Sequence, residues 1–288
     1  MTPIISIIIP CFNNESTITE TLESVYQQKL TDYEVIIIND GSTDNSVTII
    51  EQYSKENNLQ NLIVYSTQNR GQSAARNLGA KNAMGKYLLF LDADDLIHCD
   101  YLKSGVAFLE KNNSINLVYC NAQLFGSVNE IWKLPDFDPV SLLLENSIFI
   151  SAIIRKQIFE KAGAFDEKLK YIEDWDLWIR IVHLFGGIYK FKDCFFFYRK
   201  RMEKNSLTDM QLKFEDTSML YLYQKHYELY KSNGLGIVEF FNGIRNDKKY
   251  ERKYYGIWYR KLFYFVKKRS FLLIFVFYNT VGFICLIK

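Results

Sequence analysis

The sequence predicts a doubly wound α/β fold, in which helices cover both faces of a mostly parallel sheet. Two observations in the first hundred residues lead to this class. Short, nearly continuous apolar runs alternate with longer helix-like segments, and such runs are typical of strands buried on both faces. Polar residues follow several of these runs, which places them at the carboxyl ends of the strands, the edge where open α/β sheets bind ligands.

Four strands and three crossover helices are expected before residue 100. The strands are predicted at 4–9, 34–38, 62–65 and 87–91. The helices are predicted at 15–28, 44–57 and 72–83. The second helix follows Gly41-Ser42-Thr43-Asp44, which is a good N-cap sequence, and the third begins after Gly71.

The pattern becomes mixed after residue 100. Helices are predicted at 101–111 and 172–185, and strands or buried segments at 116–125, 147–154, 188–191 and 194–198. From about residue 205 the chain looks helical and rich in Tyr, Phe and Lys. The sequence therefore predicts one α/β domain over 1–205 and a helical, basic and aromatic C-terminal extension over 206–288.

Composition narrows the protein class. A chain of 288 residues with 48% hydrophobic content can bury a sizeable core. Its five cysteines are scattered without a CxxC pair, and no basic segment precedes the first apolar run, so we expect a cytoplasmic protein. The three histidines lack zinc-finger spacing, which argues against a structural zinc site.

The net charge of +2 hides an uneven distribution. Residues 244–288 carry eleven Lys and Arg against two acids, whereas the rest of the chain is acidic. Within this tail, the apolar run 271–287 follows Lys267-Lys268-Arg269 and lies at the short limit of a membrane span. We expect an interfacial segment held to anionic lipid at the inner face of the cell membrane. The alternative is a helix that packs on the body with a solvated basic face; no motif indicates nucleic acid as a partner.

The strand at 87–91 runs directly into Asp92-Ala93-Asp94-Asp95. Carboxylates at the edge of an apolar core require a metal, solvent or a basic partner. Mg²⁺ or Mn²⁺ on one or two carboxylates, with phosphate oxygens as further ligands, fits this arrangement. The alternative is an acidic loop that faces water.

Six segments taken in order resemble the family 2 glycosyltransferases, which are inverting enzymes of the GT-A fold. These segments are SIIIPCFNNE, VIIINDGSTDNS, NRGQSAARNLG, YLLFLDADD, AGAFDEKL and EDWDLWIR, and they span about residues 4–200. The resemblance implies transfer of a sugar from a nucleoside-diphosphate sugar to an acceptor hydroxyl, with inversion and with Mn²⁺ or Mg²⁺ as cofactor.

The resemblance also assigns the acidic run. It implies that Asp94 binds the metal and that Asp92 lies near the ribose or a metal-bound water, with Ala93 in the same nucleotide-sugar site. Asp95 has no assigned role, and its alternative is to cap the next turn.

Residues near the first two strand ends are implied to bind the nucleotide. Asp40 matches an acid that contacts the base; because a carboxylate accepts the N–H of uracil, a UDP-sugar is favoured. Its alternative is to open a turn. The resemblance places the nucleoside against Pro10, Phe12, Asn13 and Glu15.

Three further positions have open alternatives. Glu15 could instead be a favourable charge in a first helical turn. Arg76, rather than Arg70, is expected to face the diphosphate, although both could be surface cations. A histidine that family members often carry after a Tyr-Arg pair is missing beyond Tyr198-Arg199, which leaves Arg199 as a candidate phosphate contact.

The helix predicted at 172–185 carries the expected base. Inverting transfer needs a carboxylate that takes the acceptor proton. The resemblance assigns this role to Asp174, with Glu173 beside it, and places the turn around Gly163 near the acceptor. The alternative is that both acids only complement the helix dipole.

The sequence thus predicts a hexosyl- or hexosaminyltransferase that acts on a growing glycan or a lipid-linked acceptor. One alternative is a nucleotidyltransferase, but PCFNNE is not the Gly-rich, basic loop expected after its first strand. The other is a nucleotide-sugar-binding regulator, and the presence of Asp92, Asp94, Glu173 and Asp174 argues against it.

Overall fold

The computed structural model describes residues 2–201, 215–238 and 240. The chain divides into two compact units, residues 1–233 and 234–288. The site described below lies entirely in the first unit, which also contains the helices α8 (Glu215–Lys225) and α9 (Tyr227–Ser232). The boundary predicted near residue 205 remains a prediction.

The first half of the chain forms the parallel part of the sheet. Its strands are β1 (Ile5–Cys11), β2 (Tyr33–Asn39), β3 (Leu62–Ser66) and β4 (Tyr87–Phe90), in the order β3-β2-β1-β4. The crossover helices are α1 (Ile18–Tyr26), α2 (Ser46–Glu56) and α3 (Gln72–Asn82). Each lies at its predicted place in the chain, because apolar periodicity identifies long elements well.

The second half extends the same sheet with mixed strand directions. β8 (Ile153–Arg155) is antiparallel to β4, β6 (Leu117–Gly126) is antiparallel to β8, and β9 (Ile188–Lys200) is parallel to β6. Short strands β5 (Leu96–Ile97) and β7 (Glu130–Trp132) pair with β9 and β6. The remaining helices are α4 (Tyr101–Lys111), α5 (Lys156–Lys161) and α6 (Glu173–Phe185), with a 3₁₀ turn at Ser141–Leu143.

Some predicted elements differ from the structure. The two strands expected at 188–191 and 194–198 are one strand, β9, whose pairing with β6 shifts register around Asn121. A bulge lets one strand contain a polar interruption such as Lys192-Asp193. Only the end of the expected segment 147–154 is a strand. The pattern did not predict β5, β7 and α5, which are too short to show a period.

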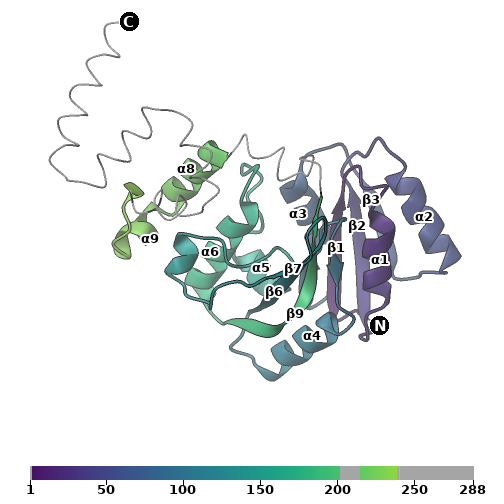
Figure 1. The fold of residues 1–288 in the computed structure, drawn as a ribbon, viewed down its shortest axis with the longest axis horizontal. Coiled ribbons are helices and arrows are strands. Elements are labelled where there is room, and N and C mark those ends of the chain that lie inside the picture. Colours follow the sequence, from purple (N-terminus) through teal and green to yellow (C-terminus); the bar gives the residue numbers. More distant parts are fainter. Residues whose placement is uncertain (1, 202–214, 239, 241–288) are drawn as a thin grey trace, which may run out of the picture. The chain divides into compact units, whose positions relative to one another are not determined.

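Helices cover both faces of the sheet (Figure 1), which confirms the predicted α/β class. On one face, α1, α2 and α4 bury side chains against residues such as Ile7, Val35 and Leu89. On the other face α3 comes so close to β1 that a Cβ at Gly79 would collide with Ile8. Phe159 of α5 packs against Phe90 on the same face. The acids that follow β4 thus emerge from a core packed on both sides.

No helix within the described residues is both long and apolar enough to cross a bilayer. The interfacial segment predicted at 271–287, together with the rest of the basic tail 244–288, lies outside the described residues.

Candidate functional site

The loops that follow β1 and β2 are tied to each other. Asn13 has a positive φ of 55° and accepts the N–H of Thr43 with its Oδ1 at 2.8 Å. Glu15 Oε2 accepts both the backbone and the side-chain N–H of Asn45 at 2.9 Å. Pro10 is buried in β1, and Phe12 next to it is half-buried. These hydrogen bonds join the two loops, and the nucleoside contacts predicted for these residues stay predictions.

Asp40 binds the loop between β3 and α3. Its side chain accepts the backbone N–H of Arg70 and of Gly71 at 2.8 Å each, and the residue is only 4% exposed. The turn after β2 is opened by Asn39 instead, which accepts the N–H of Ser42 at 2.9 Å. The hydroxyl of Thr67 also donates to Asp40 at 3.3 Å, so of about four acceptor positions on the carboxylate one remains for a further donor.

Arg76 links the metal-binding candidates to the expected base. Its guanidinium contacts Asp92 Oδ1 at 2.7 Å and Glu173 Oε1 at 2.6 Å, and the residue is 2% exposed. Burial opposes the charged form, but Asp92 and Glu173 together raise the pKa of Arg76. The alternative that Arg76 is a solvated surface cation is therefore wrong.

The three acids after β4 differ in their surroundings. The side chains of Asp92 and Asp94 are 24% and 27% exposed, whereas Asp95 is 2% exposed. Asp94 Oδ2 pairs with Arg201 at 2.8 Å, and Asp95 Oδ1 accepts the backbone N–H of Arg199 at 2.8 Å. Asp95 thus binds β9 and does not cap the next turn.

Burial and the neighbouring Asp92 raise the pKa of Asp94, although Arg201 opposes the shift. The guanidinium of Arg199, the candidate phosphate contact, donates to the carbonyl of Asp94 at 2.7 Å and to Glu20 at 2.8 Å. Arg199 is therefore occupied in holding the acidic loop. Because arginines pair with Asp92 and Asp94, the alternative of an acidic loop that only faces water is wrong.

The arrangement fits a divalent cation. Asp92 and Asp94 offer hard carboxylate oxygens on partly exposed side chains at the end of one strand, which is the ligand type that Mg²⁺ and Mn²⁺ prefer. Asp95, turned toward β9, is not available as a third ligand. Among the described residues, a second set of ligand atoms comes together at His98, Cys99 and Asp100, but there Asp100 pairs with Lys29 at 2.8 Å.

The expected base stands at the start of α6. The residue before the helix, Ile172, has a left-handed backbone with φ of 61°, a costly conformation for a β-branched residue. Asp174 accepts the backbone N–H of Trp175 at 2.8 Å and the side-chain N–H of Asn146 at 3.0 Å. Burial, followed by the charge of Glu173, raises the pKa of Asp174 to about 7. A carboxylate with such a pKa is suited to accept protons near neutral pH.

A second buried acid on α6, Asp176, was not predicted. It is fully buried and contacts Arg180 at 2.6 Å, Lys225 at 3.0 Å and His226 at 2.8 Å. Burial would raise its pKa, but His226, Arg180 and Lys225 together lower the pKa of Asp176 to about 2. The spacing of Asp176 and Arg180 could have indicated an i,i+4 pair. No comparable sequence spacing indicates the other two partners of Asp176, which are Lys225 in α8 and His226 in the turn before α9.

Arg180 also holds the turn that was predicted to lie near the acceptor. It donates to the carbonyl of Ala162, and to that of Ala164 at 2.7 Å. Gly163 between them has φ of 89°, which favours glycine. Asn146 and Arg201 are further residues of the site that sequence reasoning missed.

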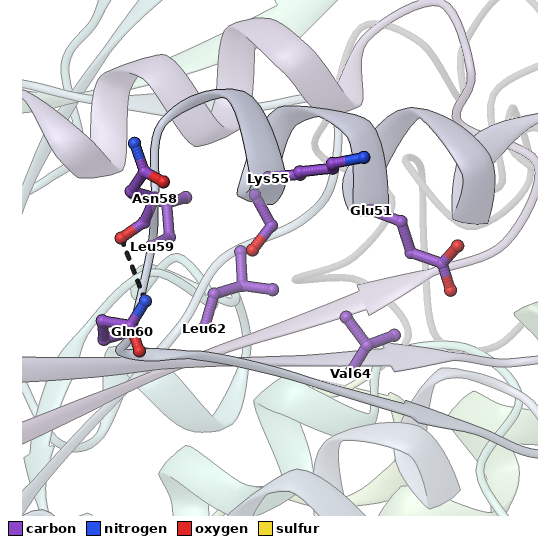
Figure 2. Close-up of a pocket in the computed structure, with 8 residues that line it drawn as sticks. Glu51, Lys55, Asn58, Leu59, Gln60, Leu62 and Val64 are labelled. Carbon is purple, nitrogen blue, oxygen red and sulfur yellow. Dashed lines mark hydrogen bonds between the residues drawn. The ribbon is translucent and has the colours of Figure 1, made fainter.

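A separate groove of about 370 Å³ lies between α2 and β3 (Figure 2). Its lining includes Glu51, Lys55, Leu62 and Val64. It contains none of the residues discussed above, so it is distinct from the candidate site.

Sequence comparison relates the chain to sugar-transferring proteins. The sequence profile described as "Glycosyl transferase family 2" matches residues 6–172. An uncharacterized glycosyltransferase of Rickettsia typhi is 30% identical over 194 residues, which cover 63% of this chain and 59% of that protein. The chain thus spans about three fifths of this relative, and 32% of a similar protein from Rickettsia felis.

Structural comparison gives the fold. Residues 1–349 of S. aureus TarS match with a TM-score of 0.65 at 24% identity, over 85% of this chain and 72% of that one. The same fragment in complex with UDP-GlcNAc matches with a TM-score of 0.62 at 21% identity, over 84% and 80%. The mannosyltransferase PcManGT of Pyrobaculum calidifontis, in complex with GDP-Man and Mn²⁺, matches with a TM-score of 0.55 at 18% identity, over 72% and 59%. These matches confirm the predicted GT-A fold.

Proposed function

Because the chain belongs to glycosyl transferase family 2, we propose that it transfers a sugar from a nucleoside-diphosphate sugar to an acceptor hydroxyl with inversion. One observation carries this proposal. Arg76 joins Asp92, beside the cation candidate Asp94, to Glu173, beside the base candidate Asp174. Arg76 thereby links the proposed cation site, which would bind the leaving group, to the proposed base, which would bind the acceptor.

Asp94, with Asp92 behind it, would hold Mn²⁺ or Mg²⁺. When bound, such an ion supplies positive charge that stabilises a diphosphate leaving group. The residues themselves fix the site: Arg199 anchors the acidic loop to β9, and Arg76 anchors Asp92 to α6.

Asp174 is the proposed general base. As the bond to the diphosphate breaks, the sugar acquires positive charge, and the acceptor oxygen attacks from the opposite face while its proton passes to Asp174. The N–H groups of Trp175 and Asn146 orient the carboxylate. Glu173 is proposed to contact the acceptor.

For the donor we propose a UDP-sugar. Asp40 has acceptor capacity for the N–H of a uracil ring, in line with the neighbour that binds UDP-GlcNAc, whereas another neighbour of similar fold binds GDP-Man. The proposed acceptor is a growing glycan, with a lipid-linked form included.

The test is a panel of UDP-, GDP- and dTDP-sugars with Mn²⁺ or Mg²⁺, scored by release of free nucleotide. We expect one donor to be consumed, and Asp94→Ala and Asp174→Ala each to slow its consumption at least a hundredfold. Asp193→Ala, at an exposed position of β9, serves as the matched control and should leave the rate unchanged. The proposal is wrong if no donor is consumed, or if the two site variants behave like the control.

A further inference from the structure

Asp92 and Asp94 are each paired with an arginine, and the two arginines differ in their exposure and in the number of carboxylates that they hold. Arg76 is 2% exposed and holds two carboxylates, Asp92 and Glu173. Arg201 is 28% exposed at its side chain and holds the single carboxylate of Asp94. The Nε atoms of both arginines are buried and have no hydrogen-bond partner within the described part of the chain.

We propose that Arg201 and the divalent cation compete for Asp94, so that Arg201 occupies this carboxylate until the cation replaces it. Arg201 would then set the affinity of the site for the cation. This inference rests on the metal role given to Asp94 in the proposed function and adds a residue that controls it.

Geometry and charge explain why Arg201 is the arginine that exchanges. Its guanidinium nitrogen lies 2.8 Å from Asp94 Oδ2 and takes one acceptor position of this oxygen, and its positive charge would repel a cation bound to the same carboxylate. If Arg76 moved away, the largely buried Glu173 and the partly exposed Asp92 would both lose their partner, a costly state.

Displacement of Arg201 carries a smaller cost. Its side chain already reaches solvent, so water can hydrate the released guanidinium. The buried Nε atoms of Arg201 and Arg76 both lack a hydrogen-bond partner among the described residues, but only Arg201 has a partly exposed side chain, so a short movement into solvent would supply one. A dication also compensates Asp92 and Asp94 more fully than one guanidinium does, which drives the exchange toward the bound cation.

The test measures Mn²⁺ binding to the full chain by calorimetry without any sugar donor. We expect Arg201→Gln to lower the Kd at least fivefold, because the competitor is removed. Lys200→Gln is the matched control, since it removes the same charge one residue away, where the ammonium lies 5.1 Å from the Trp132 ring centre. We expect it to change the Kd less than twofold.

A second measurement follows Arg201 directly in the unaltered chain. The ¹⁵Nε resonance of Arg201, assigned with Arg201→Lys, should move during a Mg²⁺ titration with the same midpoint as binding itself. The inference is overturned if wild type binds Mn²⁺ but Arg201→Gln binds it no more tightly than Lys200→Gln, or if the resonance does not respond. If neither wild type nor Arg201→Gln binds Mn²⁺, the metal role in the proposed function fails as well.

Discussion

Two acids on α6, separated by a single residue, have opposite proton affinities. Asp174 lies beside the negative Glu173 and receives neutral N–H donors from Asn146 and Trp175, so its pKa is raised to about 7. Asp176 faces Arg180, Lys225 and His226, so its pKa is lowered to about 2. Only Asp174 is therefore suited to exchange a proton near neutral pH, while Asp176 remains ionised and structural.

The raised pKa of Asp174 predicts a pH-dependent stability effect. Since its folded pKa lies above the usual value of 3.8, the stability contributed by this group is full below that value and is lost as the pH rises through about 7. Asp174→Asn should therefore unfold at a higher temperature than wild type at pH 8, by about 2–4 °C. At pH 4 the gain should largely disappear.

Differential scanning calorimetry at both pH values checks this prediction, with Asp193→Asn as the control at an exposed position. A gain that is equal at pH 4 and pH 8, or a loss at pH 8, would show that Asp174 is not held in a destabilising environment.

At the scale of elements, α6 organises the second half of the fold. Its first turn reaches α3 through the Glu173–Arg76 pair. Its second turn holds the glycine turn at 162–164 through Arg180. Asp176 receives Lys225 from α8 and His226 from the turn before α9. The helix that carries the proposed base, Asp174, is thereby fixed from three sides, which would preorganise this carboxylate.

The buried ion pairs of Asp176 predict a large loss of stability when this carboxylate is replaced by a neutral side chain. Asp176→Asn leaves three cationic or potentially cationic groups without their carboxylate, and such a change typically costs about 3–5 kcal/mol. Urea unfolding measures the loss. Asp166→Asn, which removes a more exposed partner of Lys225, is the control and should cost clearly less. Equal losses for both variants would contradict the central role of Asp176.

At the scale of the whole first unit, one arginine connects its two halves. Arg76 comes from the parallel βα part, and its partner Glu173 lies 97 residues later in the mixed part. With Asp92 included, this network joins α3, the end of β4 and α6 around a single buried guanidinium.

This network predicts a coupled pair of mutations. Arg76→Met should destabilise the fold by about 3–5 kcal/mol, because the buried Glu173 and the partly exposed Asp92 both lose their partner. Adding Glu173→Met should recover part of the loss, since it removes one unpaired charge. Urea unfolding of the two single variants, Arg76→Met and Glu173→Met, and of the double variant tests this, with Arg70→Met, a side chain 68% exposed, as the surface control. The coupling would be refuted if the double variant were the sum of the single ones.

Much of the fold could be predicted because it depends on local periodicity. Apolar runs of strand length at β1 to β4 and amphipathic helical segments between them indicate a parallel α/β sheet without knowledge of any contact. The short elements β5, β7 and α5 have too few residues to show a period, and their position follows from partners elsewhere in the sheet. The merging of two predicted strands into β9 likewise depends on its pairing with β6.

The sequence by itself determined which edge of the sheet carries Asp40, Asp92 and Asp94, because strand direction alone places these residues at carboxyl ends. Only the tertiary structure decided where each side chain is used. It turned Asp95 toward β9, buried Arg76 between two acids, and set Arg201 on Asp94 across 107 residues of chain. The physical reason is that burial and charge pairing are properties of the space between distant segments, whereas periodicity is a property of neighbours along the chain.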